Sequence, residues 1–475
     1  MNFTIFNLNL IKKFKKMILS LEENFNYPVF VILYLSIIGM MGFGAIIKYH
    51  YDGGKKFLLL RKSVILFSEV PMNINNMLKY KTIDLNRLNN KKDLLKHIDK
   101  KRFEQFLENK RNALLVLPRH DYSMGRAVID IVDLNNFKII HTYKHDIKEM
   151  RNEAFKTSEF SLSKMNNYSE RFRYRHPLLF EDGSIITHSD SSIALKIDFC
   201  SNLEWINNNK LFHHSQMLDH EGNIWVGNHM TPKSKYVNKY SIKNYLDDSI
   251  IKMNTKGKVL FNKSVTEILI ENNIFPNNFA LAAAMNTTPE KEIDPIHLND
   301  IEPAFTDTKY WKKGDVFLSL RHQSAIIHYR PSTNKVINYI TGPFANQHDI
   351  DIISDKEISI FNNNNFYVNN DYSEVVIYNF ETKKFKTLFN DQLQKNNFKT
   401  FTEGLSHIFK DGALMVEEQN HGRIILFNNK GEKEWEFINK DKNGDIGDIS
   451  WSRIIEDELF IKKFKSLVKN KTCLN

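Results

Sequence analysis

A short pattern recurs from about residue 112 onward and constrains the fold more than any other feature of this chain. Each copy has a tight turn, two runs of β-branched and aromatic residues, and a second turn before a closing strand. Turn residues between such runs are typical of antiparallel hairpins. Copies of the first turn are EDGSIITHS (181–189), HEGNIWVGN (220–228), KKGDVFLSL (312–320), SDKEISIFN (354–362) and KDGALMVEE (410–418).

The copies divide the chain into units of four expected strands, and such units read as the blades of a propeller. We therefore predict an all-β fold, a six-bladed β-propeller spanning residues 112–455. The alternative is a pair of β-sandwiches, which gives no reason for the repeated order of turns and strands. The six units begin near Ala113, Arg171, His213, His297, His348 and Ser406.

Residues 28–47 form a run of twenty residues without a charged side chain. A run of this length can span a bilayer as a helix. Lys48, Tyr49 and His50 follow in place of a small-residue cleavage site, so we predict an uncleaved transmembrane signal anchor; a buried core helix is the alternative. Similar numbers of lysines flank the two ends of residues 28–47, so the charge distribution does not indicate which side of the membrane the propeller is on. The other expected segments are a tail at 1–27, a linker at 48–111 with an amphipathic helix at about 93–107, and a basic tail at 456–475.

The net charge of +10 is spread over short lysine runs. No helix-turn-helix, zinc finger or RNA-binding aromatic motif accompanies these runs, so no nucleic-acid partner is predicted. The two cysteines, Cys200 and Cys473, allow at most one disulfide, and whether they pair is open. Neither a metal site nor a cofactor is predicted, and the oligomeric state is not determined by the sequence.

Three polar residues stand at the edges of predicted strand units: His297 in DPIHLNDIEP, Arg321 in VFLSLRHQSA and His348 in FANQHDIDII. A closed radial fold would gather them on one axis. A neutral imidazole beside a guanidinium and a second imidazole suits the handling of a tetrahedral oxyanion. Each residue alone is commonly structural, and a histidine cluster can instead bind a metal, but Arg321 argues against a cation in the same pocket.

With His214 before an EGN turn, DPIHLNDIEP, SLR, QHD and FNNN in that order, the chain resembles the bacterial arylsulfotransferase family over about residues 112–440. The resemblance implies a six-bladed propeller that moves a sulfuryl group from an aryl sulfate donor to a phenolic acceptor without a nucleotide sulfate donor. It also implies an inner-membrane protein with a single span and a periplasmic propeller. DHEGN (219–223) and FNNN (361–364) depart from the family pattern, in ways that affect turn geometry more than chemistry.

The resemblance also assigns roles to residues. His348, in the QHD match, would be the nucleophile, and His297 and Arg321 would share the catalytic work. The implied substrate-binding residues are His214 or its neighbour His213, Asn299 and Ser406.

Sulfuryl transfer passes through a loose transition state like that of phosphoryl transfer, and a sulfohistidine intermediate would split it into two steps. The competing hypothesis is a non-catalytic, membrane-anchored propeller that binds an anionic ligand such as a sulfated glycan, because a fold does not set a function.

Overall fold

The structure is a computed structural model that describes residues 27–51, 95–108, 111–146, 172–239, 245–274, 293–365 and 372–473. The chain divides into two compact units, residues 1–91 and 92–475. The predicted tail at 1–27 and most of the predicted linker at 48–111 lie outside the described residues.

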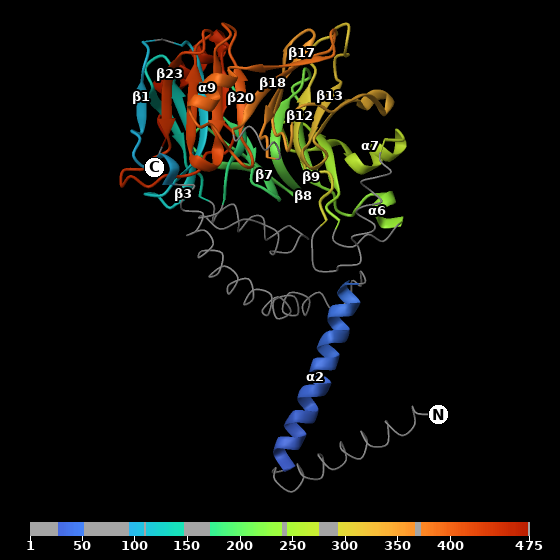
Figure 1. The fold of residues 1–475 in the computed structure, drawn as a ribbon. Helices are drawn as coiled ribbons and strands as arrows, with labels where there is room; N and C mark the ends of the chain where they lie inside the picture. The colour runs from blue at the N-terminus through green and yellow to red at the C-terminus, as the bar shows by residue number, and fades with distance from the viewer. Residues whose placement is uncertain are drawn as a thin grey trace. The chain divides into compact units, whose positions relative to one another are not determined.

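Helix α2, Tyr27–Tyr51, is the described element of the first unit (Figure 1). It covers the stretch where a membrane helix is predicted. A search of the described residues nevertheless finds no helix with the length and apolar character needed to cross a membrane. The predicted membrane anchor is therefore not confirmed.

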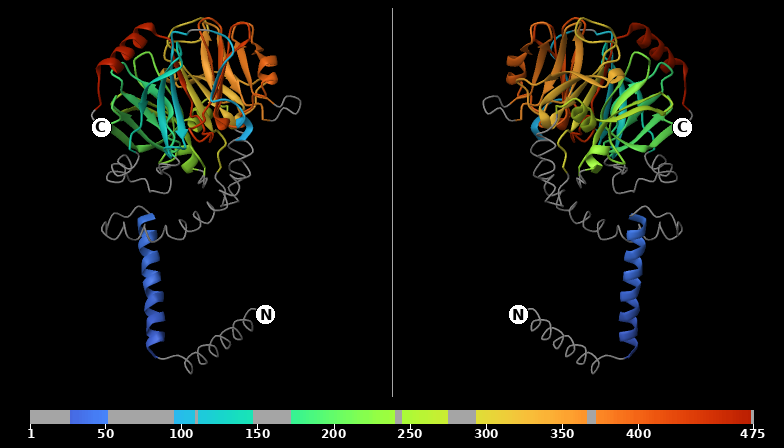
Figure 2. Two further views of the ribbon diagram at one scale, coloured as in Figure 1. Left: turned by 90° about the vertical axis from the view of Figure 1, so that its left-hand side faces the viewer. Right: turned by 90° about the vertical axis from the view of Figure 1, so that its right-hand side faces the viewer.

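Four separate antiparallel sheets have the strand order of a propeller blade, as predicted (Figures 1 and 2). One contains β12 (Leu298–Pro303), β13 (Val316–Leu320), β14 (Ala325–Arg330) and β15 (Lys335–Ile340). The next contains β16 (Ile350–Ser354), β17 (Glu357–Asn362), β18 (Glu374–Asn379) and β19 (Lys384–Leu388). The third contains β20 (Leu405–Ile408), β21 (Leu414–Glu418), β22 (Arg423–Phe427) and β23 (Lys433–Ile438), with β1 (Phe103–Gln105) added outside.

The fourth sheet joins the two ends of the second unit. Its order is β24 (Arg453–Ile455), β2 (Leu114–Asp121), β3 (Arg126–Asp133) and β4 (Lys138–Tyr143). The last strand of the chain thus pairs with an early one, with Leu114 opposite Ile455. Such a pairing closes the ring of sheets and satisfies edge strands that would otherwise be open.

The fifth sheet has seven strands, so the predicted count of six separate blades is not confirmed. It contains β5 (Arg175–Leu179), β6 (Ile185–His188), β7 (Ser192–Ile197), β8 (Leu203–Leu218), β9 (Ile224–His229), β10 (Asp248–Met253) and β11 (Val259–Ser264). The 16-residue strand β8 makes this sheet continuous. Its first part pairs with β7 and its last part with β9, and the register with β9 shifts between His213 and Gln216.

Local chemistry explains the predicted turns. In the first one, Asp182 accepts a hydrogen bond from the backbone nitrogen of Ser184 at 2.8 Å. Gly183 then adopts a φ of 78°, a left-handed conformation that glycine tolerates without steric cost. In the turn before β9, Asp219 accepts hydrogen bonds from the backbone nitrogens of Glu221 at 2.8 Å and Asn223 at 3.0 Å, and Gly222 has a φ of 75°. These turns keep strand pairs in register.

Buried apolar side chains lie between successive sheets and form the core. One cluster joins the sheet of β12–β15 to that of β16–β19, with Trp311 and Phe344 among its members. Another joins the last sheet to the closing sheet, with Trp435 and Trp451 buried to 2 % exposure. Each of these two clusters is shared by two sheets, so neighbouring sheets stabilise one another.

Buried aspartates link neighbouring sheets by hydrogen bonds. Asp248 accepts from the backbone nitrogen of Leu298 at 2.7 Å, and Asp300 accepts from that of Ile350 at 2.9 Å. Asp349 accepts from the backbone nitrogen of Ser406 at 3.0 Å. These bonds fix the starts of β12, β16 and β20, next to the predicted site residues His297, His348 and Ser406.

The amphipathic helix predicted at about 93–107 is wrong. The described part of that stretch forms a short 3₁₀ turn, Leu95–His97, followed by strand β1. Phe103 pairs with Phe437 in the sheet, and its ring lies 4.4 Å from that of Phe137. Pairing with the open edge of β23 and aromatic packing outweigh the helical periodicity, because β propensity and pattern depend on tertiary context.

The predicted basic tail contains an ordered helix, α10, Glu458–Asn470 (Figure 2). Asp457 caps it by accepting from the backbone nitrogen of Phe460 at 2.7 Å. Ile461 and Phe464, three residues apart, lie on one face of the helix. Both are buried in a cluster formed by strands β2 to β7. Cys473, just beyond the helix, forms a disulfide with Cys200, with a Cα–Cα distance of 5.4 Å.

Candidate functional site

His348 lies two residues before β16, buried to 1 % exposure. Its Nδ1 lies 2.6 Å from the side-chain oxygen of Asn363 and therefore donates to it. Its Nε2 accepts a 2.8 Å hydrogen bond from the backbone nitrogen of Glu403. Burial lowers the pKa of His348 well below its usual value, and the charge of Arg321 lowers it further. The ring is therefore neutral near pH 7, with its lone pair on Nε2.

His214 and His297 lie beside His348, as the sequence predicts. The ring of His214 lies 5.0 Å from that of His297 and 6.4 Å from that of His348, measured between centroids. Trp451 completes this cluster, 5.9 Å from His214 and 6.4 Å from His348. His213 lies behind His214, so the geometry identifies His214 as the member of the pair that faces the other histidines.

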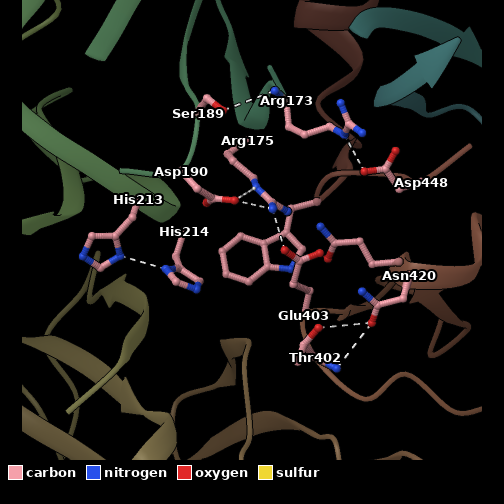
Figure 3. A network of polar contacts seen from close by, with 12 residues as sticks. Arg173, Arg175, Ser189, Asp190, His213, His214, Thr402, Glu403, Asn420 and Asp448 are labelled. Carbon is pink, nitrogen blue, oxygen red and sulfur yellow. Dashed lines mark hydrogen bonds and ion pairs between the residues drawn. The ribbon is translucent and has the colours of Figure 1, made fainter. Parts of the chain in front are cut away.

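A chain of polar contacts extends from His214 to a buried carboxylate. Its Nδ1 lies 2.7 Å from Nδ1 of His213 (Figure 3). On the other side of that ring, Nε2 of His213 lies 3.3 Å from Oδ1 of Asp248. Nε2 of His213 makes no hydrogen bond to this carboxylate, which instead accepts one from Nδ1 of His229 at 2.9 Å. The negative charge of Asp248 nevertheless favours a proton on the His213 ring. When Nδ1 of His214 is the donor in the contact with His213, Nε2 of His214 keeps its lone pair.

A second carboxylate orients His297. Oδ2 of Asp294 lies 2.5 Å from Nδ1 of His297, and its Oδ1 accepts from the backbone nitrogen of the same residue at 3.0 Å. Sequence reasoning did not assign a role to Asp294. Its position three residues before a predicted site histidine, in DPIH, is the signal that could have identified it.

Arg321 begins a short 3₁₀ turn after β13 and is partly exposed. Its Nη1 lies 2.7 Å from Nε2 of His322, and its Nε has no hydrogen-bond partner. Within the described ranges no carboxylate forms an ion pair with it. Burial lowers the pKa of Arg321, although Asp294 and Glu403 partly offset the effect. The guanidinium is thus a cation at the histidine cluster that still has an N–H donor available for a ligand.

The remaining two predicted residues are placed differently. Asn299 lies in a bulge of β12, where Leu298 pairs with Leu320 and Asp300 with Ser319. Its amide nitrogen donates to the backbone oxygen of Gln347 at 2.9 Å, so it is partly committed to structure. Ser406 lines a separate cavity further along the inner strands, with none of the site histidines among the lining residues.

A buried ion-pair network that sequence reasoning missed adjoins the histidines (Figure 3). Arg175 binds Asp190 through Nε at 2.9 Å and Glu403 through Nη2 at 2.5 Å. Burial opposes its charge, but Asp190 and Glu403 outweigh that effect and raise its pKa. The RYRHP stretch at the start of the second predicted unit was the available signal. Glu403 links this network to His348, because its backbone nitrogen donates the hydrogen bond that Nε2 of His348 accepts.

Backbone strain gathers at this cluster. Among non-glycine residues with positive φ are His214 at 60°, His297 at 51°, Glu403 at 60° and Trp451 at 58°. Left-handed conformations cost such residues roughly 1–2 kcal/mol each, and they persist where surrounding structure enforces them. Four strained residues in one cluster are typical of a functional site.

A family comparison identifies this arrangement. The family model described as Arylsulfotransferase (ASST) matches residues 176–440, more than half of the chain. The match spans His214, His297, Arg321 and His348. The chain belongs to the arylsulfotransferase family. Membership confirms the resemblance drawn from the sequence and indicates an arylsulfotransferase-like function.

Other comparisons add little for this arylsulfotransferase-family chain. No curated protein matches it. A crystal structure of a protein of unknown function from Bacteroides caccae matches with 12 % identity over 73 % of this chain and 100 % of that one, at a TM-score of 0.45. Virginiamycin B lyase from Staphylococcus aureus matches with 12 % identity over 55 % and 69 %, at a TM-score of 0.31. Neither similarity bears on function.

Two groups of described side chains have the composition of a metal site: His213, His229 and Asp248, and Asp294, His297 and His322. In the first, the two rings stack at 4.2 Å and 22°, so their in-plane lone pairs run nearly parallel and do not converge on one ion. In the second, the Arg321 guanidinium contacts His322. Hydrogen bonding explains both groups better than metal binding does.

Proposed function

We propose that this protein moves a sulfuryl group from an aryl sulfate donor to a phenolic or other hydroxyl acceptor, through a sulfohistidine at His348. The observation that carries the proposal is the pairing of a neutral, buried His348 with Arg321, a guanidinium without a carboxylate partner in the described chain. Neutral imidazole is nucleophilic, and a planar guanidinium fits sulfonate oxygens.

In the first step, the Nε2 lone pair of His348 attacks the sulfur of the donor. The S–N bond forms as the bond from sulfur to the aryl oxygen breaks, and the bonding electrons leave with the phenolate. Arg321 and His297 face the sulfonate oxygens and stabilise the charge spread over them in the transition state. The Asn363 contact keeps the ring proton on Nδ1 throughout.

In the second step, Nε2 of His214 takes the proton of the acceptor hydroxyl as its oxygen attacks sulfur. The S–N bond breaks and its electrons return to His348. His214 then releases that proton to the solvent, and the phenolate released in the first step takes up a proton from the solvent, so the overall reaction neither consumes nor produces a proton. Asp248, acting through His213, stabilises the transient imidazolium on His214. Asp248 is a positioning residue, since it contacts no reacting atom.

The bond from Glu403 to Nε2 of His348 must open before the attack. Glu403 lies in a strained turn, with φ of 60°, followed by Gly404 at 99°. A sulfonate oxygen at the cluster could accept the freed backbone N–H. Movement of residues 401–404 would thereby exchange one hydrogen bond for another.

Mass spectrometry tests the covalent step. The full-length protein is incubated with p-nitrophenyl sulfate, with no phenol acceptor, and digested under conditions that preserve N–S bonds. We expect a sulfuryl adduct on the peptide containing His348, lost on addition of phenol and absent from His348→Asn. The matched control His220→Asn changes a partly exposed turn histidine and should keep the adduct. An adduct on another residue would refute the mechanism.

One observation supports the alternative of a non-catalytic propeller that binds a sulfated ligand. In this structure the proposed nucleophilic atom already accepts a hydrogen bond from Glu403. A binding protein needs no free Nε2, whereas an enzyme must expose it. Saturable binding of an aryl sulfate, with neither adduct nor release of p-nitrophenol, would favour this alternative.

For the setting, we propose that the propeller lies outside the cytoplasm, held at the inner membrane by the segment around residues 28–47. The Cys200–Cys473 disulfide supports an oxidising compartment, because such bonds are rare in the cytosol. Reporter fusions at the C-terminus test the orientation: a reporter active only after export is expected, and one active only in the cytosol would refute it.

We also propose that the seven-stranded sheet is two blades joined through β8, which would give six in all. Three features support the count. The register of β8 shifts next to His214. A buried cluster packs β5–β7 against β8–β10 within this one sheet. Positive φ values also recur once near the start of each of six inner segments, at His176, His214, His297, Asn346, Glu403 and Trp451. A crystal structure would test it.

A further inference from the structure

A cavity of about 460 Å³ lies between the last sheet and the closing sheet. Strands β1 and β23 form one wall, and β2, β3 and the start of β4 form the other. β1 lengthens the first wall, because it pairs as a fifth strand with the outer edge of β23. Of the described residues that line this cavity, none belongs to the histidine cluster. Cavities of about 300–1,000 Å³ commonly hold small organic ligands.

Three aromatic rings gather on the walls of this cavity. Phe103 of β1 lies 4.4 Å from Phe137, in the turn before β4, measured between ring centroids. Trp435 of β23 lies 6.1 Å from Phe103 and 5.8 Å from Phe137. Both phenylalanines are only partly buried against the core beneath them. An apolar ligand would cover this surface, and aromatic rings favour contact with another aromatic group.

Two cations stand beside these rings in the lining of the cavity. Arg102 directly precedes Phe103, and Lys138 directly follows Phe137. Both cationic side chains are exposed, and neither forms an ion pair or a side-chain hydrogen bond with any described residue. The edge of the cavity therefore attracts a negatively charged group.

The one acidic residue among the described lining residues does not offset these cations. Asp130 is 1 % exposed, and its two carboxylate oxygens accept hydrogen bonds from Nε of Arg119 and from the hydroxyl of Thr142, both at 2.7 Å. Its charge is therefore largely balanced within the closing sheet, and its oxygens are committed to the fold.

We propose that this cavity binds a small aromatic anion, with a body of one or two rings and one carboxylate-like group. Phe103, Phe137 and Trp435 would contact the rings of the ligand, and Arg102 and Lys138 would pair with its charge. Exposed ion pairs contribute little free energy, so apolar contact supplies most of the affinity and the two cations supply the preference for an anion. Binding here does not depend on sulfuryl transfer.

Calorimetry of the full-length protein with 2-naphthoate at pH 7.5 tests this proposal. The probe has neither a transferable sulfuryl group nor an acceptor hydroxyl. We expect saturable binding of one molecule per chain with a Kd below about 1 mM. The neutral analogue 2-naphthamide should bind at least threefold more weakly because it lacks the charge. Octanoate should also bind at least threefold more weakly, because it lacks the rings.

Charge-removing variants show where the probe binds. R102Q/K138Q should weaken 2-naphthoate binding at least threefold and leave 2-naphthamide binding unchanged, whereas a structural defect would weaken both. K256Q/K258Q is the matched control and should bind as the parent does, because it removes two exposed lysines from the turn between β10 and β11. Arg321→Gln should also bind as the parent does, which separates this cavity from the histidine cluster.

A cavity-filling variant supplies a second line of evidence. Val132 lines the cavity from β3 and is only partly buried, so V132F should abolish binding of both naphthyl ligands. If V132F fails to fold, R102Q/K138Q decides alone, since it changes exposed side chains. The proposal is overturned if 2-naphthoate does not bind the parent, if R102Q/K138Q binds it as tightly as the parent does, or if Arg321→Gln abolishes binding. Equally tight binding of 2-naphthamide or octanoate would overturn the assigned ligand class.

Discussion

The Nε2 atom of His348 accepts a 2.8 Å hydrogen bond from the backbone nitrogen of Glu403, a residue whose side chain binds Arg175 at 2.5 Å. The proposed nucleophile is thus tied to a buried ion pair through one strained residue. Its other ring nitrogen donates to Asn363, which holds a single tautomer. Opening of the Glu403 turn, and not reorientation of the ring, is the conformational step that would expose Nε2.

Arg321→Lys should lower kcat/KM for an aryl sulfate by about 100-fold, since one ammonium cannot reproduce a planar fork of donors in the transition state. The fold should be unaffected, because Arg321 has no described ion-pair partner. Steady-state release of p-nitrophenol measures the effect. Arg330→Lys is the matched control: its guanidinium binds Asp315 at 2.7 Å, and we expect near-parental kinetics. Equal losses in both variants would contradict a specific role for Arg321.

The pH profile of the first step should show a neutral His348 well below pH 6.5. Burial and the charge of Arg321 both disfavour the protonated ring and lower its pKa. Removing that charge in Arg321→Gln favours protonation, so the acidic limb of log kcat/KM should move to higher pH. Profiles between pH 4.5 and 8 measure the shift. A parental limb at or above pH 7, or no movement in the variant, would argue against His348 as the nucleophile.

Asp248→Asn should lower kcat by about 10- to 100-fold, as expected for a weakened general base. Loss of the negative charge disfavours protonation of His214 through His213, so the acidic limb of kcat should move to lower pH. Asp315→Asn is a matched control, since Asp315 is also buried against a histidine, His328, at 2.8 Å. Both variants should unfold more readily. A fall in kcat without the pH shift would indicate a merely structural role.

Cys200→Ser should lower the free energy of unfolding by about 2–5 kcal/mol, because the bond closes a loop between residues 273 apart in sequence. Urea unfolding measures the loss. Cys473→Ser and the double variant should match it, and a reductant should destabilise only the parent. If the parent is insensitive to reductant and contains two free thiols by mass, the disulfide is refuted.

Part of the site was predictable because its signals are local. His297, Arg321 and His348 each lie in a short motif next to a turn, and the turns themselves follow from residues such as Asp182 and Gly183. The choice between His213 and His214 stayed open in the sequence. It depends on a φ of 60° at His214, within a strand that bends there, and adjacent residues give no warning of it.

The order of hairpin turns along the chain determined an all-β, propeller-like architecture and pointed to His297, Arg321 and His348 as candidate site residues, because strand periodicity and turn chemistry are local properties. Tertiary structure alone decided the rest. The edge of β23 turned residues 103–105 into a strand, and apolar contacts made residues 458–470 a packed helix. Arg175 and Glu403 meet from positions 228 residues apart. Such contacts depend on how sheets close around an axis, which no local pattern encodes.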